Sequence, residues 1–427
     1  MRLAADTGNA FAEFGLPGEP GTDAFWAAAR TPLSVPVGDD DGDGDGGWRT
    51  LFLWRGSPAT IEFESWSEPV PLRRWGDTDC WYAEVRMPAR LRVTYRFLVG
   101  DETGGEAGGE AYADPFNPEG AGGDRSIAAT PDAPAQPHWP AVGADDILPL
   151  PSTRIRWASR LLGGRRTVRV HAAGGGGPLV LLLDGDDWLY LHPAMTAFDS
   201  AVAAGDMPPV TLVFLPAKDR EAEFGCRPEL WEAVRDELLP LVAECGVPAD
   251  PERMVVVGQS LGGLSAVYAA LEFPELVSRV ACQSGSFWWS PGVVGAADPL
   301  GGPVGGAIAE RVAERLERAG GVGHPDHVDG AGLAGLAEGA GIAGRAGLAG
   351  RAGVSGRAGL SGRAGLSGLR VAFDVGEHET RMLPHCELTE MLVRQAGASV
   401  RVSRSASGHD RAGWRQALLR DVAWVLG

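Results

Sequence analysis

Few cysteines, few tyrosines and a shortage of basic side chains set the first limits on this sequence. The 427 residues include five widely spaced cysteines and no CxxC pair, which excludes a disulfide framework and a zinc site of the usual spacing. Lys and Arg total 38 against 56 Asp and Glu, so the net charge is −18. This balance makes nucleic acid and anionic membrane surfaces poor partners.

Long hydrophobic runs are also missing. No eighteen uninterrupted apolar residues occur, so we expect no membrane span. The opening residues MRLAADTGNAFAEFG lack the apolar core of a signal peptide, and we therefore expect a cytoplasmic protein.

Part of the acidic excess is local. Residues 38–47, GDDDGDGDGG, hold five aspartates, and Asp41, Asp43 and Asp45 alternate as calcium ligands can. Phe52, however, stands where such a loop requires a bidentate glutamate. We interpret the run as a solvated insertion, and we expect neither a metal nor another cofactor.

The chain length favours two domains. For residues 1–150 we predict an antiparallel, immunoglobulin-like β-sandwich, because short β-branched and aromatic runs alternate with turn-rich pieces. The predicted strands are Thr50–Trp54, Ala59–Phe63, Trp81–Arg86 and Leu91–Leu98. The proline-rich PDAPAQPHWP, residues 131–140, reads as an extended linker, and we place the boundary near Pro149–Pro151.

Residues 151–427 have a different pattern of predicted elements, in which Val- and Leu-rich strands alternate with helices. This pattern predicts an α/β-hydrolase fold with a doubly wound, mostly parallel sheet. The predicted strands are Arg166–Ala172, Pro178–Gly185, Pro209–Leu215, Arg253–Gly258, Val277–Gly285, Arg370–Gly376 and Ser399–Ser405. The predicted helices are Pro228–Cys245, Ser265–Glu272, Pro384–Ala396 and Arg411–Leu426.

One glycine-rich stretch interrupts this alternation of strands and helices. From Gly344 a six-residue unit repeats as GRAGLA, GRAGVS, GRAGLS and GRAGLS. Such a composition cannot offset the entropy of ordering, so we predict a flexible insertion over residues 320–368. A solenoid is the alternative, but units without large apolar side chains stack poorly.

The hexapeptide Gly258–Gly263, GQSLGG, contains a G-x-S-x-G motif. It follows a buried-type strand and opens a helix, which is the context of a nucleophile elbow. We therefore predict Ser260 as a nucleophile, with a helix N-cap as the simpler structural reading.

A serine needs a base, and the α/β-hydrolase order places it on the loop before the last helix. His409 in SGHDRAGW stands there, and its neighbour Asp410 is predicted to cap that helix. The acid should follow the strand RVAFDVG. Glu379 is the first choice, Glu377 the second, and Asp374 within the strand the third.

Oxyanion donors and a substrate wall are the remaining expectations. The backbone N–H of Leu261 is one predicted donor, and that of Asp186 or Asp187 is the other. Four aromatic residues follow strands where parallel sheets bind substrates, and they could wall a planar substrate: Trp188, Phe287, Trp288 and Trp289.

Several stretches resemble the enterochelin (ferric enterobactin) esterase family. The front half carries WRTLFLWRG, DPFNP and PDAPAQPHW, and the rear half carries LLLDGDDWL, GQSLGGLSAVYAALEFPELV, QSGSFWW and GHDRAGWR in the family's order. The resemblance implies hydrolysis of the serine trilactone of a catecholate siderophore in the cytoplasm, with iron entering only as part of the substrate. It supports Ser260, His409 and Glu379 in their roles, and DREAEFGC implies that Arg220 faces the catecholate.

Two other functions remain open at this stage. An esterase for phenolic or feruloyl sugar esters is one, because the front sandwich also resembles glycan-binding modules. A non-catalytic siderophore-binding protein with a vestigial elbow is the other.

Overall fold

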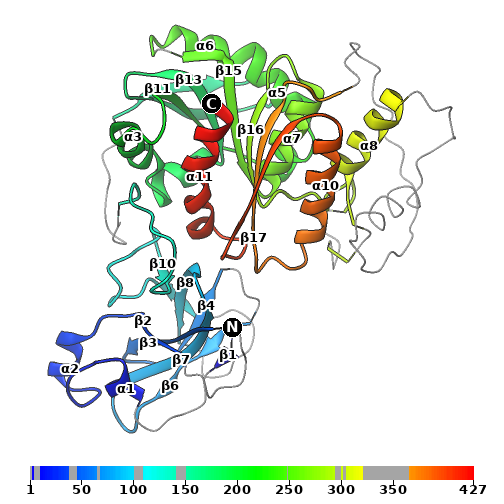
Figure 1. Cartoon of the computed structure of the whole chain (residues 1–427). Helices are drawn as coiled ribbons and strands as arrows, with labels where there is room; N and C mark the ends of the chain where they lie inside the picture. The colour runs from blue at the N-terminus through cyan, green and yellow to red at the C-terminus, as the bar shows by residue number, and fades with distance from the viewer. Residues whose placement is uncertain are drawn as a thin grey trace.

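The computed structural model describes residues 2–3, 10–37, 46–64, 68–100, 109–140, 151–247, 249–293, 300–301, 304–320 and 365–427. The acidic run at 38–45, the expected domain boundary within 141–150 and nearly all of the glycine-rich repeat lie outside these residues. Figure 1 shows a smaller body built from the N-terminal strands and a larger one with a central sheet between helices. No helix in these ranges is long and apolar enough to cross a membrane.

The N-terminal body contains two antiparallel sheets. One has the order β1 (Arg2–Leu3), β7 (Cys80–Pro88), β3 (Gly47–Arg55) and β2 (Leu33–Pro36), with β6 (Arg73–Arg74) also paired to β7. The other has the order β10 (Ser126–Ala129), β8 (Arg92–Val99), β4 (Ala59–Phe63) and β5 (Val70–Pro71), with β9 (Glu110–Tyr112) also paired to β8.

One apolar core joins these two sheets face to face. Phe52 and Val85 come from the first sheet, and Phe63, Tyr95 and Phe97 from the second, and all are buried in the same cluster. The alternation of buried and partly exposed positions in β4 is the period-2 pattern of a strand with one buried face. The antiparallel character predicted for this region is therefore observed.

A second apolar cluster covers the other face of the first sheet. The short helices α1 (Ala10–Glu13) and α2 (Asp23–Ala28) supply Phe11, Phe25 and Trp26, which pack against Leu51 and Leu53 of β3. These helices were not predicted, because each is too short to show a helical period.

An eight-stranded sheet forms the centre of the larger body. Its order is β11 (Thr153–Ala158), β12 (Arg165–Ala173), β14 (Val210–Leu215), β13 (Gly177–Leu183), β15 (Ala249–Gln259), β16 (Arg279–Gln283), β17 (Arg370–Gly376) and β18 (Ser399–Ser405). The pairs β11–β12 and β12–β14 are antiparallel, and all pairs from β14 to β18 are parallel. The mostly parallel α/β sheet is therefore as predicted.

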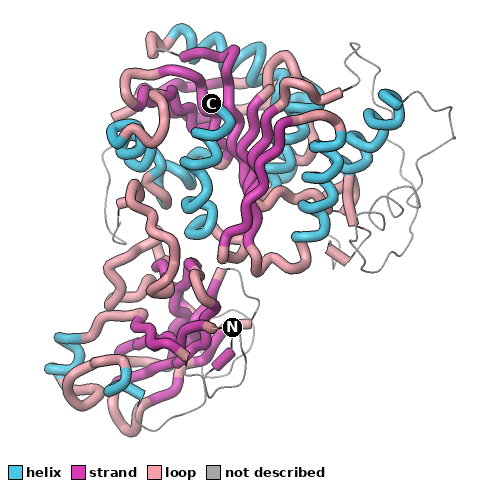
Figure 2. Tube along the Cα trace, viewed as in Figure 1, coloured by secondary structure: helices cyan, strands magenta, loops and turns pink. Residues whose placement is uncertain are grey.

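Helices cover both faces of this sheet (Figure 2). Helices α3 (Ala194–Ala204) and α11 (Arg411–Leu426) share one core with Val180 and Leu182 of β13. Alternate residues of the same strand, such as Leu181, pack into the core on the opposite face. That face carries α5 (Pro228–Ala233), α7 (Leu261–Glu272), α8 (Ala307–Gly320) and α10 (Leu383–Gln395). Burial on both faces explains why the central strands are apolar throughout.

Several details differ from the sequence expectations. The edge strand β11 was not predicted. The helix predicted over 228–245 is α5, a π-helical segment at Val234–Leu238, and α6 (Leu239–Glu244). Helix α7 begins at Leu261, four residues before the predicted start. Helices α3 and α8 were not predicted. All five cysteines are free thiols, as their spacing indicated.

Two glycines allow α7 to lie against β15 and β16. A Cβ on Gly258 would stand 2.1 Å from the carbonyl oxygen of Gly262, and one on Gly263 would stand 2.8 Å from the sulfur of Cys282. A Cβ on Gly262 would meet nothing closer than 3.5 Å. The close packing therefore requires glycine at Gly258 and Gly263 but not at Gly262.

We expect Gly258→Ala to lower the free energy of unfolding by about 3 kcal/mol, because the added methyl meets backbone that cannot move aside. Gly262→Ala, four residues away in the same turn, is the matched control and should change it by less than about 1 kcal/mol. Denaturant unfolding of both variants measures the difference. Equal stabilities would contradict the packing described here.

A buried carboxyl lies on α11 away from the predicted site residues. Asp421 is fully buried, its Oδ1 accepts a hydrogen bond from Arg420 at 3.1 Å, and its Oδ2 has no hydrogen-bond partner among the described residues. Burial raises the pKa of Asp421 to about 7, and the attraction of Arg420 opposes this only in part. The folded protein therefore retains this proton up to a pH at which the unfolded chain has lost it.

The contribution of Asp421 to stability should fall as pH rises from about 4 to 7, because there the folded state binds more protons than the unfolded state. Asp421→Asn cannot ionise, so we expect it to be more stable than wild type at pH 8 by roughly 1–3 kcal/mol and nearly equal at pH 4. Denaturant unfolding at both pH values tests this, with Glu244→Gln at an exposed carboxylate as the control. A stability difference that does not change with pH would refute the assignment.

Candidate active site

Ser260 occupies the turn between β15 and α7. Its backbone has φ 54° and ψ −119°, a strained conformation for a residue with a side chain. Its N–H donates to the Gln283 carbonyl at 2.9 Å, and its own carbonyl accepts from the Ser286 N–H at 3.0 Å. These bonds hold the strain and fix the serine at the carboxyl end of β15. The hydroxyl oxygen lies 3.2 Å from that of Ser286.

His409 and Glu379 come together from two different loops. Imidazole Nδ1 lies 2.7 Å from Oε2 of Glu379, and the Glu379 side chain is 2% exposed. When Nδ1 donates to this carboxylate, Nε2 is left unprotonated and can accept a proton. The His409 side chain is 36% exposed, so one side of the ring faces solvent.

The second oxygen of Glu379 is held as well. It accepts from the Gly376 N–H at 2.8 Å and from the Ser284 hydroxyl. That hydroxyl in turn accepts from the indole N–H of Trp414 at 2.8 Å, and the Trp414 ring lies edge-on to the His409 ring with centroids 5.0 Å apart. Donors on both oxygens fix the direction of the carboxylate.

The two other candidate acids lie elsewhere. Glu377 is exposed, and its N–H donates to the Ser405 carbonyl. Asp374 is buried and accepts hydrogen bonds from Ser403 and Ser405 on β18. Of the three carboxylates, Glu379 is the one that the structure brings to His409.

The segment after β16 links the serine to the His409–Glu379 pair. Ser286 binds Ser260, and Ser284, two residues earlier, binds Glu379. Within the described part of the chain the Ser260 hydroxyl bonds to Ser286 and not to His409. The hydrogen bond between Ser260 and His409 stays a prediction; bonds of this kind often tighten only when substrate binds.

The candidate oxyanion donors differ from one another. The Asp187 N–H already donates to the Asp184 carbonyl at 3.1 Å. Among the described residues no turn, loop or cap hydrogen bond is formed by the N–H of Asp186 or Leu261. The structure therefore favours Asp186 over Asp187 as the partner of Leu261 in an oxyanion hole.

The predicted aromatic wall needs correction. Trp188 and Phe287 are fully buried, and Trp289 is 8% exposed, because all three fill the cores beside the sheet. Of the four, Trp288 is the one that is half-buried, and it packs against the edge of the core. The sequence could not separate these cases, since an aromatic residue after a strand serves either purpose.

Trp188 instead takes part in a buried chain of hydrogen bonds beneath the site. Its indole N–H donates to the side-chain oxygen of Gln259 at 3.0 Å, and the Gln259 amide donates to Gln283 at 3.0 Å. Gln283 donates to the Trp414 carbonyl at 2.7 Å. This buried chain of hydrogen bonds ties the residue before Ser260 to the helix that follows His409.

Arg220 reaches the site but is engaged by the protein. Its guanidinium binds both carboxylate oxygens of Asp184, at 2.9 and 3.1 Å, and the Gln259 carbonyl at 3.0 Å. The side chain remains 37% exposed, so a substrate can still approach it. A second arginine, Arg411, pairs with Asp187 at the same edge.

Three other histidines have different surroundings. His171 lies between the Pro151 carbonyl and Asp199, and His385 accepts from the Gly305 N–H. His192 is fully enclosed, and burial holds its pKa well below the ordinary value. Among the described residues no group of three or more His, Cys, Asp or Glu side chains could hold a metal ion.

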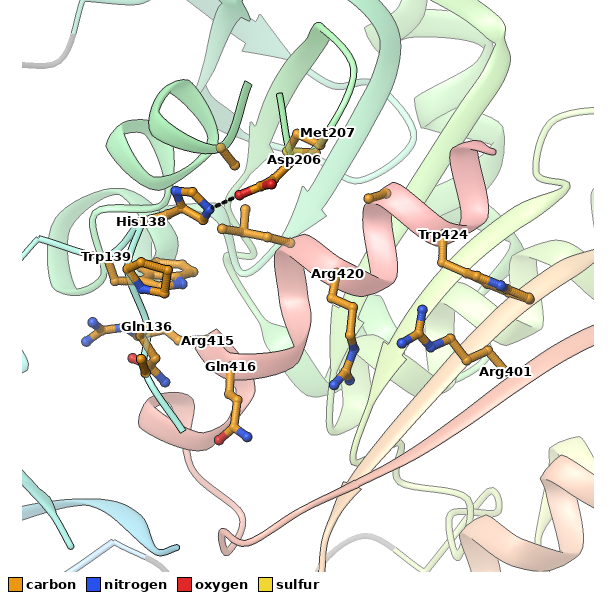
Figure 3. Close-up of a pocket in the computed structure, with 15 residues that line it drawn as sticks. Gln136, His138, Trp139, Asp206, Met207, Arg401, Arg415, Gln416, Arg420 and Trp424 are labelled. Carbon is orange, nitrogen blue, oxygen red and sulfur yellow. Dashed lines mark hydrogen bonds and ion pairs between the residues drawn. The ribbon is translucent and has the colours of Figure 1, made fainter. Parts of the chain in front are cut away.

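A cavity of about 490 Å³ lies along the outer side of α11 (Figure 3). It is bounded by the linker residues Gln136, His138 and Trp139 and by Arg420 and Trp424 of α11. None of the predicted site residues lines it. This cavity is therefore separate from the candidate active site.

Sequence reasoning missed three residues of the site: Ser284, Ser286 and Trp414. The first two stand in QSGS directly after β16, where side chains reach the active edge of a parallel sheet. Their place directly after a strand was the sequence signal that could have identified these two serines. Trp414 lies in the same GHDRAGW stretch as His409, but its bond to Ser284 depends on tertiary packing.

Comparison with known proteins gives consistent matches over both bodies. Residues 50–139 match the family model described as "Enterochelin esterase, N-terminal", and residues 159–315 match the one described as "Putative esterase". The iron(III) enterobactin esterase of Dickeya dadantii is 32% identical over 322 residues, which are 64% of this chain and 73% of that protein. The iron(III) salmochelin esterase of Escherichia coli is 25% identical over 442 residues, covering 94% of this chain and 93% of that protein.

Solved structures agree. The crystal structure of the enterobactin esterase from Shigella flexneri in the presence of enterobactin superposes with a TM-score of 0.68 at 25% identity, covering 95% of this chain and 98% of that one. The sheet order, the turn at Ser260 and the esterase match define an α/β esterase. The chain belongs to the enterobactin (enterochelin) esterase family, which the sequence motifs had indicated.

Proposed function

We propose that this protein is a serine esterase that opens the trilactone ring of a catecholate siderophore such as ferric enterobactin, and so releases iron in the cytoplasm. The observation that carries the proposal is the contact of 2.7 Å between His409 and Glu379, beside a strained serine at the end of β15. The family membership supports the substrate class.

The first chemical step is acyl transfer to the enzyme. His409 Nε2 takes the proton of the Ser260 hydroxyl as the serine oxygen attacks a seryl ester carbonyl. The N–H groups of Leu261 and Asp186 donate to the oxyanion that forms. The C–O bond of the ester then breaks, and His409 gives its proton to the leaving serine oxygen. Because the ester is part of a ring, the whole opened siderophore stays attached to Ser260.

Water completes the second step. His409 removes a proton from a water molecule, which attacks the acyl-enzyme carbonyl, and the proton passes to the departing Ser260 oxygen. Glu379 holds the imidazole and stabilises its positive charge in both steps. The linear product binds iron less well, since the preorganised ring is lost. Iron enters this scheme only as part of the substrate, and the protein uses no metal of its own.

Electrostatics of the site also bear on the substrate. A trianionic ferric complex meets a protein of net charge −18, so local cations must guide it. Arg220 and Arg411 stand at the active edge, although each is paired with an aspartate. We propose that the exposed part of Arg220, together with Trp288, contacts a catecholate ring.

Product analysis tests the proposal. Enterobactin with and without iron should each give linear dihydroxybenzoyl-serine products, observed by mass spectrometry, and Ser260→Ala should give none. A feruloyl sugar ester is the comparison substrate. Faster hydrolysis of that ester, or tight siderophore binding without any product at high enzyme concentration, would overturn the proposal.

The proposal also divides the chain into two domains. We propose a β-sandwich domain of immunoglobulin-like type over residues 1–150 and a catalytic domain over residues 151–427. The two five-stranded sheets around one core support the first, and the single eight-stranded sheet supports the second. Limited proteolysis that yields stable fragments ending near residue 150 tests the boundary.

A further inference from the structure

The side chain of Asp410 joins the two bodies directly behind His409. It is fully buried, and its carboxylate accepts from the backbone N–H of Thr94 at 2.6 Å and from the Thr94 hydroxyl at 3.0 Å. It also accepts from the Ala412 N–H at 2.6 Å, as the cap of α11 that the sequence predicted. Thr94 belongs to β8 of the N-terminal body, 316 positions away in the chain.

This contact lies at the edge of the sheet that carries the candidate site. In Figure 1, β8 and β10 stand at the end of the N-terminal body nearest to the start of α11. Gly122 of the same body packs against Leu191, where a Cβ on Gly122 would come within 3.0 Å of the Leu191 Cα. The active edge of the sheet is therefore in contact with the N-terminal body.

The His409 loop is held from two sides. On one side the acid loop binds it, because His378 N–H donates to the Ser407 carbonyl at 3.1 Å and Glu379 binds the imidazole itself. On the other side Asp410, the next residue after His409, is fixed by Thr94. With both anchors in place the backbone on either side of the imidazole has little freedom to move.

Strand β8 is a firm support for this anchor. It is paired with β4 and with β10, and the Thr94 carbonyl accepts from the Glu64 N–H at 3.0 Å. The Thr94 N–H leaves the strand ladder and donates to Asp410. The Thr94 N–H and the Asp410 carboxylate supply each other's hydrogen-bond partner. Leaving either group buried without a partner would cost folding free energy.

We propose that the N-terminal domain positions the catalytic histidine, with Thr94 holding Asp410 so that the His409 imidazole stays between Glu379 and Ser260. Thr94 and Asp410 are positioning residues in this account, and neither touches substrate. The inference rests on the catalytic role proposed for His409. Because the domain acts through His409 and not by touching substrate, it affects the hydrolysis of every ester, including esters too small to contact the domain.

Thr94→Val tests this in the full-length protein at pH 8, where the Asp410 carboxyl, whose pKa burial raises to about 6, is ionised. Valine keeps the shape of threonine and removes only the hydroxyl donor. With a small p-nitrophenyl ester we expect kcat to fall about ten- to a hundredfold while KM changes little.

Two controls separate positioning from a general weakening of the domain contact. Thr94→Ser restores the hydroxyl and should return kcat close to wild type, with KM still little changed. Gln136→Ala removes another bond between the bodies, from the Gln136 amide to the Ala412 carbonyl at 2.9 Å, and should leave both unchanged. Circular dichroism confirms that each variant is folded. If Thr94→Val does not fold, Thr94→Ala compared with Gln136→Ala gives the same contrast.

Wild-type kcat in a folded Thr94→Val protein would overturn the inference. Equal losses in Thr94→Val and Gln136→Ala would do the same, since they would indicate loosening of the whole junction. Failure of the proposed function itself gives another result: Ser260→Ala would then keep its activity, whatever Thr94→Val does.

Discussion

Ser260→Ala is expected to lower kcat on a trilactone siderophore by about 10⁴-fold or more. The hydroxyl forms the bond to the substrate. Ser284, another serine of the site with a positive φ (48°), has its hydroxyl bonded to Glu379 and Trp414 instead. The variant should bind the siderophore and remain folded, because alanine removes one hydroxyl whose hydrogen bond is to Ser286. Product formation followed by chromatography, with siderophore binding by tryptophan fluorescence, measures both quantities.

Ser286→Ala is the matched control for this variant. It removes the hydroxyl that faces Ser260 but leaves the nucleophile, so kcat should stay within about tenfold of wild type. If Ser286→Ala lost as much activity as Ser260→Ala, the nucleophile would have to be reassigned.

Glu379→Gln should lower kcat by about 10³- to 10⁴-fold with little change in KM. Glutamine fills the same space, yet it carries no charge to stabilise the imidazolium and can present an N–H to His409 Nδ1 in place of an acceptor. The side chain is 2% exposed, so water cannot easily replace the lost interaction. Steady-state kinetics over a range of pH would measure the loss.

Glu377→Gln tests the choice between the two glutamates. Glu377 is exposed and lies two residues from Glu379, so its replacement should leave kcat within about twofold of wild type. A large loss in Glu377→Gln together with an active Glu379→Gln would show that the acid had been assigned to the wrong residue.

The sequence predicted the sheet of the larger body well, for a definite reason. Strand β13 is buried on both faces, so its run of leucine and valine signals a parallel strand without ambiguity. Helix α3 gave no such signal, because Ala194–Ala204 is rich in alanine and shows a weak helical period. Its place was decided by packing of Met195 and Phe198 on the sheet.

The meeting of Glu379 with His409 was predictable because the chain order of the fold constrains it. Glu379 and His409 stand on loops after consecutive strands, and parallel strands bring such loops to one edge. The sequence could not predict which aromatic residues are buried. Trp188 and Trp288 look alike in the sequence, yet Trp188 is in the core and Trp288 is half-buried. The bond of Asp410 to Thr94 crosses 316 positions, and only the folded chain reveals it.

The most direct test of the central claim is peptide mapping by mass spectrometry after reaction with an alkyl fluorophosphonate. This reagent forms a stable phosphonyl ester with a serine that an adjacent base has activated, and fluoride leaves. We predict one phosphonyl group per chain, on the peptide that contains Ser260, formed slowly when siderophore is present and hardly at all in His409→Ala. Inactivation with the group on another residue, or unlabelled Ser260 in a protein that still cleaves the siderophore, would contradict the pairing of these two side chains.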